Sequence, residues 1–308
     1  MSSTVSCDIS KNMSDGFLDM LVFVRVTEAG SLSRAARELG FSLTVVSRKL
    51  SRLEERLGVR LVNRTTRSLT LTEEGSRFYD RSVRILAEIE DAETEAASGR
   101  DSAIGTLRVT ATFAFGIRWL APLLAEFQQS HPSLNVRLDT ADGLVNIVEE
   151  GYDLAVRFGS LADSSLIARQ LAPNRRVICA APEYLERYGR PSSVEDLVDH
   201  DIVSFGDTPN THWNFEDGRS VNVRSRLGTN NGELAHRWAL QGRGLIMKSI
   251  WDVEDDIASG KLEIVLPGEK LPSAPIHAVF PHTRLAAAKV RLCVEFLATR
   301  LKRASREA

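Results

Sequence analysis

Cysteine is scarce in this chain, and the short motifs of common enzymes are missing. Only three cysteines occur among 308 residues, at the distant positions Cys7, Cys179 and Cys293, which argues for a reducing compartment rather than a disulfide framework. The six histidines, at 131, 200, 212, 236, 277 and 282, show no metal-ligand spacing. The sequence also lacks a glycine-rich phosphate loop, a Gly-x-Ser-x-Gly elbow and a paired-cysteine motif. We therefore expect no enzymatic activity, no catalytic residue, no cofactor and no metal.

Long apolar runs are absent as well. No segment approaches the roughly 20 apolar residues of a membrane span, and residues 1–16 read as a polar tail without the apolar segment of a secretory signal. The composition is otherwise ordinary, with 43% apolar residues, 26% charged residues and a net charge of −2. The sequence predicts a cytoplasmic protein with no membrane partner.

What the chain does contain is a pair of short helices joined by a tight turn. Apolar positions recur at helical spacing in the first helix, and Gly40 supplies the left-handed residue that ends it. A second helix is predicted to begin at once, with Ser42 as its N-cap. Its buried stripe consists of Val46, Leu50, Leu53 and Leu57. This arrangement is the outline of a helix-turn-helix motif that reads DNA.

The opposite face of the second helix is polar and basic. A helix face that enters the major groove of DNA needs such side chains, because they can bind base edges and phosphates. Residues 60–71 follow as two short β-like runs around a polar tip, which is typical of a wing. Residues 31–70 contain nine basic and three acidic residues and thus have a net charge of +6, whereas the whole chain has a net charge of −2. The positive charge is therefore concentrated in this segment. We predict DNA contacts from Arg34, Thr44, Ser47, Arg48, Ser51, Arg52, Arg64 and Arg67.

A long helix is predicted next, over residues 73–98, with Thr72 as its cap and Glu73 and Glu74 in its positive first turn. One stripe of this helix has heptad spacing and is formed by Phe78, Ser82, Ile85, Ile89, Ala92 and Ala96. Such a stripe can pack within its own domain or against a second copy. We favour a dimer seam, because the helix stands between two domains.

From Thr106 onward, strand patterns alternate with helix patterns. Strands are expected near 107–112, 134–138 and 153–158, with helices between them, one of which ends at Glu150. Further strands are expected at 176–181, 201–205, 244–248 and 275–280, and a helix at 232–241. This alternation predicts an α/β domain.

Residues 17–301 resemble a LysR-type transcriptional regulator. The resemblance rests on Phe23-Val-Arg-Val26, Glu28-Ala-Gly-Ser31, Ser33-Arg-Ala-Ala36, Leu53-Glu-Glu-Arg-Leu-Gly58, Leu61-Val-Asn-Arg-Thr-Thr-Arg67 and Leu71-Thr-Glu-Glu-Gly75. One departure is Ser42-Leu-Thr-Val-Val-Ser47, where many members have Ser-Gln-Pro-Ala-Val-Ser. The missing Gln removes a side chain that can contact adenine through two hydrogen bonds, so base preference is not transferable from relatives.

The resemblance implies an N-terminal winged helix-turn-helix of the all-α type, a linker helix and a C-terminal α/β domain with two lobes, similar to type II periplasmic binding proteins. The expected divisions are a tail at 1–16, the DNA-binding domain at 17–72, the linker and dimerisation helix at 73–98, a hinge at 99–105, the effector-binding domain at 106–301 and a tail at 302–308. Lobe I is expected at 106–175 and 268–301, and lobe II at 176–267.

The resemblance also implies an effector, and we expect a small organic acid. Free backbone N–H groups at helix starts can hold a carboxylate, and two segments, one in each lobe, qualify. Phenylalanines and Ala114 in the first segment predict a pocket of low polarity, suited to an aromatic or branched acid. The predicted effector contacts are Thr110, Thr112, Phe113, Ala114, Phe158, Gly159, Asn230 and Asn231. Thr112, Asn230 and Asn231 have a plainer interpretation as helix-capping residues.

The sequence thus predicts a sequence-specific transcription regulator whose promoter binding is modulated by a small molecule. Its expected partners are double-stranded promoter DNA, an effector of unidentified structure, a second or further copies in a homodimer or homotetramer, and RNA polymerase as a further candidate. An architectural DNA-binding protein without a ligand is the alternative. A solute-binding module is a weaker one, because the N-terminal motif argues against it.

Overall fold

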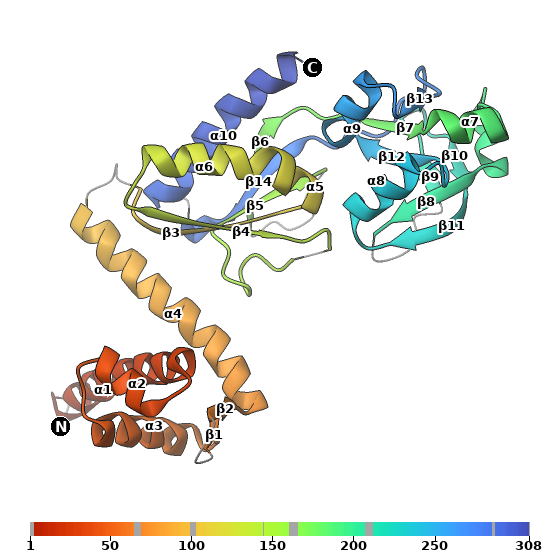
Figure 1. Cartoon of the computed structure of the whole chain (residues 1–308). Coiled ribbons are helices and arrows are strands. Elements are labelled where there is room, and N and C mark those ends of the chain that lie inside the picture. The colour runs from red at the N-terminus through yellow and green to blue at the C-terminus, as the bar shows by residue number, and fades with distance from the viewer. Residues whose placement is uncertain are drawn as a thin grey trace. The chain divides into compact units, whose positions relative to one another are not determined.

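The computed structural model describes residues 3–64, 69–98, 103–143, 145–159, 166–206, 212–284 and 287–307. It contains two compact units, Met1–Glu93 and Thr94–Ala308. The first unit begins with three helices, α1 (Ser3–Ala29), α2 (Leu32–Glu38) and α3 (Leu43–Leu57). A two-stranded antiparallel sheet follows, β1 (Val62–Arg64) with β2 (Leu69–Leu71), and then α4 (Glu73–Ser98) (Figure 1).

The helix-turn-helix forms for the reasons that the sequence predicts. Gly40 has a left-handed φ of 66° between α2 and α3, and the Ser42 hydroxyl accepts a hydrogen bond from the Val45 amide at 3.3 Å. Val46, Leu50 and Leu53 are fully buried. They pack against Phe23 of α1 and against α2 in one apolar cluster. The wing that follows is confirmed as the antiparallel pair β1 and β2.

The segment predicted as a polar N-terminal tail, residues 1–16, is helical from Ser3 onward, as the first part of α1. Neither proline nor glycine occurs between residues 3 and 15 to end a helix. The helix therefore continues through a segment that carries no apolar periodicity.

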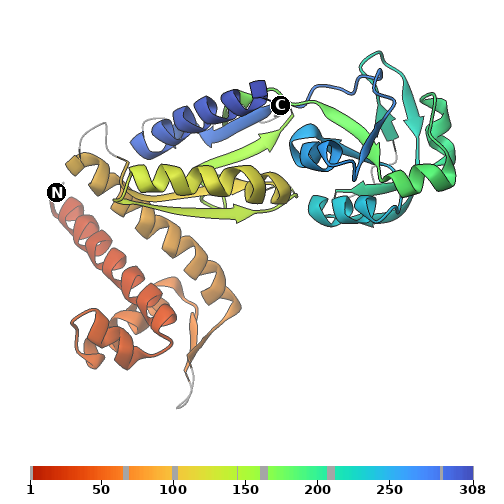
Figure 2. The same ribbon diagram turned by 45° about the horizontal axis from the view of Figure 1, so that its top comes forward.

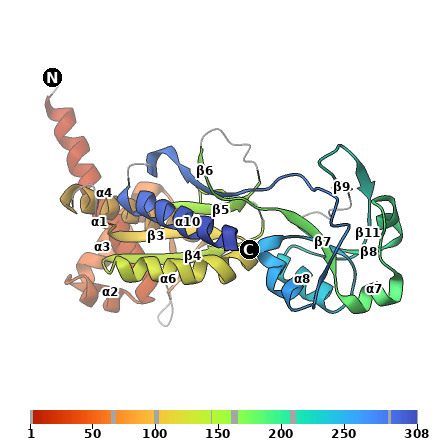
Figure 3. The same cartoon turned by 90° about the horizontal axis from the view of Figure 1, so that it is seen from above.

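Lobe I of the second unit (105–172 and 276–307) is built on a five-stranded mixed sheet in the order β4-β3-β5-β14-β6. The strands are β3 (Gly105–Ala111), β4 (Leu134–Thr140), β5 (Leu154–Phe158), β6 (Leu166–Ala172) and β14 (Ile276–Pro281). The helical segments are α5 (Phe113–Phe115), a π-helical turn (Gly116–Leu120), α6 (Ala121–Ser130), a 3₁₀ turn (His282–Arg284) and α10 (Ala288–Glu307). Helices α6 and α10 lie side by side over the sheet (Figures 2 and 3).

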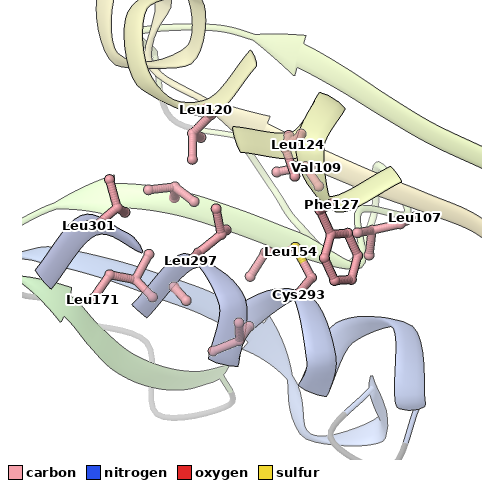
Figure 4. Packing of buried hydrophobic residues seen from close by; sticks show 14 of the residues in the cluster. Leu107, Val109, Leu120, Leu124, Phe127, Leu154, Leu171, Cys293, Leu297 and Leu301 are labelled. Atoms are coloured by element: carbon pink, nitrogen blue, oxygen red, sulfur yellow. The ribbon is translucent and has the colours of Figure 1, made fainter. Parts of the chain in front are cut away.

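The core of lobe I lies between this sheet and the two helices. Leu124 and Phe127 of α6 and Leu297 and Leu301 of α10 gather with Leu107, Val109 and Leu154 of the sheet (Figure 4). The rings of Phe127 and Phe296 are 5.4 Å apart and join the two helices directly. Burial of each such side chain contributes roughly 1.5–3 kcal/mol to folding, so this core fixes the strand ends that reach the cavity described below.

Lobe II (176–265) contains two small sheets and a hairpin. The antiparallel sheet β12-β7-β13 and the parallel pair β11-β8 are linked by a bridge between Ile202 and Leu245. The strands are β7 (Arg176–Ala180), β8 (Asp201–Phe205), β9 (His212–Asn214), β10 (Ser220–Asn222), β11 (Arg224–Thr229), β12 (Ile246–Ser249) and β13 (Glu263–Val265). The helices are α7 (Pro182–Tyr188), a 3₁₀ turn (Glu195–Asp199), α8 (Gly232–Leu240) and α9 (Ile250–Ala258).

The prediction of a helix ending at Glu150 is wrong. Residues 147–151 form turns instead. The Asn146 side chain accepts from the Glu149 amide at 3.1 Å, and the Glu150 side chain accepts from the Asn146 amide at 3.2 Å. These two bonds cap a single turn, and Gly151 with φ of 69° ends it. The segment between the capping residue Asn146 and the terminating residue Gly151 is too short for a helix.

Candidate functional site

The polar face of α3 is the first candidate site. Thr44 and Arg48 are exposed, and Ser47 and Ser51 are partly exposed, on the side opposite the buried stripe. Helical geometry places these four positions on one face of about two turns. The α3 face therefore presents hydroxyl and guanidinium groups together, the combination that reads base edges and phosphates.

Arg52 on the same helix has an intramolecular partner that the sequence did not indicate. Its Nε lies 2.6 Å from Oδ2 of Asp19, and its second terminal nitrogen lies 2.7 Å from Oδ1. Lys49 also approaches Asp19, at 3.4 Å. Asp19 is only 2% exposed, so the pair joins α1 to α3. Arg52 is held by this fork and orients α3, which limits the reach of its guanidinium to DNA.

The wing is anchored by a second acidic residue. The carboxylate of Glu54 accepts from the amides of Leu61 and Val62, at 2.9 and 3.2 Å. Thr72 caps α4, as predicted, because its hydroxyl accepts from the Gly75 amide at 2.9 Å. Arg34 is exposed on α2. Arg67 and the side chain of Arg64, both predicted to contact DNA from the wing, lie outside the described residues.

The predicted seam of α4 divides into two parts. Phe78 packs on its own domain, with its ring 5.6 Å from that of Phe23, and Ser82 is fully buried with its hydroxyl on the Phe78 carbonyl at 2.7 Å. For these two positions the intramolecular interpretation holds, because the first turns of α4 cover α1. Ile85 is 42% exposed, and Ile89 lines a groove of about 300 Å³ between α1 and α4. The side chains of Ala92 and Ala96 lie outside the described residues.

The second candidate site is a cavity of about 290 Å³ in the C-terminal unit. Its apolar wall includes Phe158 from lobe I and Phe205, Trp213 and Met247 from lobe II. Its full lining is Thr112, Ala114, Asp142, Phe158, Asn174, Arg176, Val203, Ser204, Phe205, Trp213, Met247, Lys248, Ser249, Asp252 and Ala274. A space of this size and lining suits a small metabolite with an apolar body and a few polar groups.

The charges around this cavity are unequally paired. Lys248 is buried and forms an ion pair with Asp252, whose Oδ2 lies 2.7 Å from its Nζ. Arg176 donates to the Pro272 carbonyl at 3.1 Å, and within the described part of the chain its buried Nε has no hydrogen-bond partner. Burial lowers the pKa of Arg176. Among the described residues, therefore, no carboxylate pairs with the Arg176 guanidinium.

The structure places only part of the predicted effector set in this cavity. Thr112, Ala114 and Phe158 line it. Thr110 is buried beneath it and accepts from Arg157 at 3.3 Å. Gly159, with φ of 88°, donates to the Pro275 carbonyl.

In lobe II, Asn230 is exposed, and Asn231 takes the plainer role considered for it. The Asn231 side chain caps α8 by accepting from the Glu233 and Leu234 amides at 2.9 and 3.0 Å.

Phe113 contributes its backbone to a contact that the sequence did not reveal. Its amide donates to Oδ1 of Asp142 at 2.9 Å, and the Gly232 amide donates to Oδ2 at 2.5 Å. The two helix starts predicted to hold an effector carboxylate are therefore bridged by a carboxylate of the chain itself. Asp142 and Arg176 are the main cavity residues that sequence reasoning missed, and neither belongs to a local motif.

Three further observations bear on function. Among the residues that the structure describes, no cluster of three His, Cys, Asp or Glu side chains is placed to hold a metal ion. No helix in the same residues is long and apolar enough to cross a membrane. Cys179 and Cys293 are buried, which raises the pKa of each thiol to about 12, so both stay protonated and unreactive.

Comparison with known proteins agrees with this arrangement. The family described as bacterial regulatory helix-turn-helix protein, lysR family, matches residues 17–76, and the LysR substrate binding domain matches residues 100–302. The HTH-type transcriptional regulator DmlR of Escherichia coli strain K12 is 39% identical over 284 residues, covering 91% of this chain and 92% of that protein. The HTH-type transcriptional regulator CrgA of Neisseria meningitidis serogroup B is 37% identical over 287 residues, covering 92% and 96%.

A solved structure extends the likeness to the fold. The structure of CrgA, a LysR-type transcriptional regulator from Neisseria meningitidis, has a TM-score of 0.60 at 36% identity and covers 92% of this chain and 98% of that one. The predicted fold class, a helix-turn-helix domain followed by a two-lobed α/β domain, is thereby confirmed. The chain belongs to the LysR family of bacterial helix-turn-helix transcriptional regulators.

Proposed function

We propose that this regulator senses a small organic acid, which occupies the cavity with its carboxylate on Arg176. The observation that carries the proposal is the buried Nε of Arg176, which has no partner within the described residues. A buried charge without an ion partner costs folding free energy, and an anionic ligand offsets that cost. Phe158, Phe205 and Trp213 provide the apolar wall for the rest of the molecule.

The DNA-binding end of the proposal rests on the α3 face. Thr44, Ser47 and Arg48 contact base edges in the major groove, with Ser51 beside them, while Arg34 and the wing residues Arg64 and Arg67 contact phosphate or the minor groove. Base contacts give sequence preference, and phosphate contacts give affinity and salt dependence. Arg52 acts mainly through its fork on Asp19, which sets the angle of α3.

Assembly and location complete the proposal. Phe17 and Val83, which are 37% and 36% exposed, line the groove between α1 and α4 together with Ile89, and Ile85 is exposed elsewhere on α4. A second copy packs against these apolar side chains of α1 and α4 to form a homodimer or, by further contacts, a homotetramer. The protein has no enzymatic activity of its own. It works in the cytoplasm on promoter DNA, where RNA polymerase is a further partner.

Thermal stability of the full chain tests the effector site. We expect hexanoate, 3-phenylpropanoate or benzoate to raise the melting temperature more than the corresponding neutral amide, because only the acid pairs with Arg176. Arg176→Gln should abolish the difference between acid and amide. Arg175→Gln, an exposed neighbour outside the cavity lining, is the matched control and should keep it. Equal shifts with acids and amides, or an acid effect that survives in Arg176→Gln, would contradict the proposal.

A further inference from the structure

We propose that Asp142 is a specificity-determining residue that restricts the cavity to acids with a single carboxylate. This inference rests on the proposed function, since it names the class of acid that the same cavity accepts. The cavity lining already contains a carboxylate, the side chain of Asp142.

Asp142 occupies the backbone donors that a second acid group would need. Its Oδ1 accepts from the Phe113 amide at 2.9 Å in lobe I, and its Oδ2 accepts from the Gly232 amide at 2.5 Å in lobe II. Each oxygen thus takes one N–H at the start of a helical segment, where unpaired donors and the helix dipole favour negative charge. The side chain imitates a bound carboxylate and fills its place.

The side chain is held where it is by its surroundings. Arg157 donates to the carbonyl of the preceding residue, Ala141, at 2.9 Å, and it also contacts Thr110 at 3.3 Å. On the other side, Lys248 donates to the Gly232 carbonyl at 3.4 Å. Both ends of the bridge are therefore fixed by buried or partly buried cations, and a ligand must meet Asp142 in this position.

The charge balance of the cavity gives the same result. Lys248 is neutralised by Asp252, so Arg176 is the cation of the cavity lining that has no carboxylate partner among the described residues and can pair with one carboxylate of a ligand. Oδ1 of Asp252 is also buried and has no partner within the described residues. A second ligand carboxylate would meet both acids, and like charges a few ångströms apart in a partly dry site repel strongly. A ligand hydroxyl meets no such repulsion.

Paired probes test the inference with the full chain. Hexanoate and hexanedioate, and benzoate and benzene-1,4-dicarboxylate, differ by one carboxylate each, and their dissociation constants are measured by calorimetry. We expect the unaltered protein to bind each monoacid at least about tenfold more tightly than its diacid. Asp142→Ser frees both amides and removes the charge, so it should bring the two constants within about threefold by improving diacid binding.

Two control variants keep the outcome interpretable. Asp142→Asn keeps the size of the side chain and should narrow the preference in the same direction, with unchanged circular dichroism. Asp139→Ser removes an acidic residue of β4 that pairs with Arg137 and should keep the full preference for monoacids.

Each result has a distinct meaning. Equal binding of monoacid and diacid by the unaltered protein would overturn the inference while leaving the proposed function intact, provided that Arg176→Gln abolishes both. A monoacid preference that persists in folded Asp142→Ser, or monoacid binding lost in both Asp142 variants, would show that Asp142 is only a structural bridge. Failure of all four acids to bind would count against the proposed function itself.

Discussion

At the scale of single residues, two arginines four positions apart on α3 show how neighbours with the same chemistry acquire different tasks. Arg48 is exposed, whereas Arg52 forms a two-point ion pair with Asp19, which is 2% exposed. An acid buried this deeply depends on its cations, because an unpaired buried charge is costly. The sequence marks both arginines as basic residues of a DNA-binding helix, and only the fold separates them.

Alanine substitutions should separate the two arginines in solution. Arg52→Ala should lower the free energy of unfolding of the DNA-binding unit by about 1–2 kcal/mol, because Lys49 remains near Asp19 and Arg52 is partly exposed. Arg48→Ala should leave stability unchanged and weaken operator binding by about 1–3 kcal/mol. Denaturant titration and fluorescence anisotropy with operator DNA measure the two quantities. Equal effects of both variants on stability would remove the distinction.

At the scale of elements, α4 serves two surfaces along its length. Its first turns bury Ser82 and pack Phe78 on Phe23, while Ile85 one turn later is exposed. Heptad spacing alone predicted one continuous seam, because a periodic pattern does not say which partner covers each turn. The packing of α1 decides this for the first half.

A charge placed on the exposed turn of α4 should disrupt assembly. Ile85→Asp buries two carboxylates against each other at a symmetric seam, so the dimer should dissociate and operator affinity should fall. Ser76→Asp adds the same single negative charge at an exposed position on the opposite side of the helix and serves as the control. Sedimentation velocity measures the state of assembly. A dimeric Ile85→Asp with normal operator binding would place the seam elsewhere.

Sequence and structure agree best where signals are local. The turn at Gly40, the caps Ser42 and Thr72 and the stripe of α3 need only residues within a few positions, and the structure confirms them. The cavity was harder to predict, because its chemistry comes from distant segments. Asp142 meets Gly232 across 90 positions of sequence, a contact that no periodicity encodes. The helix starts were identified, but their internal carboxylate was not.

At the scale of the whole molecule, two buried histidines link stability to pH. Burial lowers the pKa of His236 below its ordinary value of 6.5, and the Lys248 charge lowers it further, against Asp256, Glu233 and Asp252. Burial likewise lowers the pKa of His200. Both therefore bind protons less tightly in the folded state than in the unfolded chain, which takes them up as the pH falls below about 6.5.

Stability contributed by these histidines is therefore present above pH 6.5 and is lost as the pH falls from there toward their folded pKa values. We expect the melting temperature of the full chain to decrease between pH 7.5 and 5.5. His236→Gln should make this decrease shallower, with His200 accounting for part of the remainder. The measurement is a melting series across that range. An identical slope in both proteins would contradict the assignment to His236.

If this regulator senses an acid, then the acid in the C-terminal cavity must alter DNA binding by the N-terminal helix-turn-helix. A ligand shifts such an equilibrium only by as much as it favours one state, so the effect is measurable as a change in operator affinity.

The most direct test measures the dissociation constant for a promoter fragment bound by the full chain, with and without the acid that most raises its melting temperature. The acid should change this constant in the unaltered protein, whereas Arg176→Gln should bind the promoter equally well but no longer respond to the acid. An acid response that persists in Arg176→Gln, or a promoter affinity unaffected by saturating acid in the unaltered protein, would show that an acid on Arg176 does not control DNA binding.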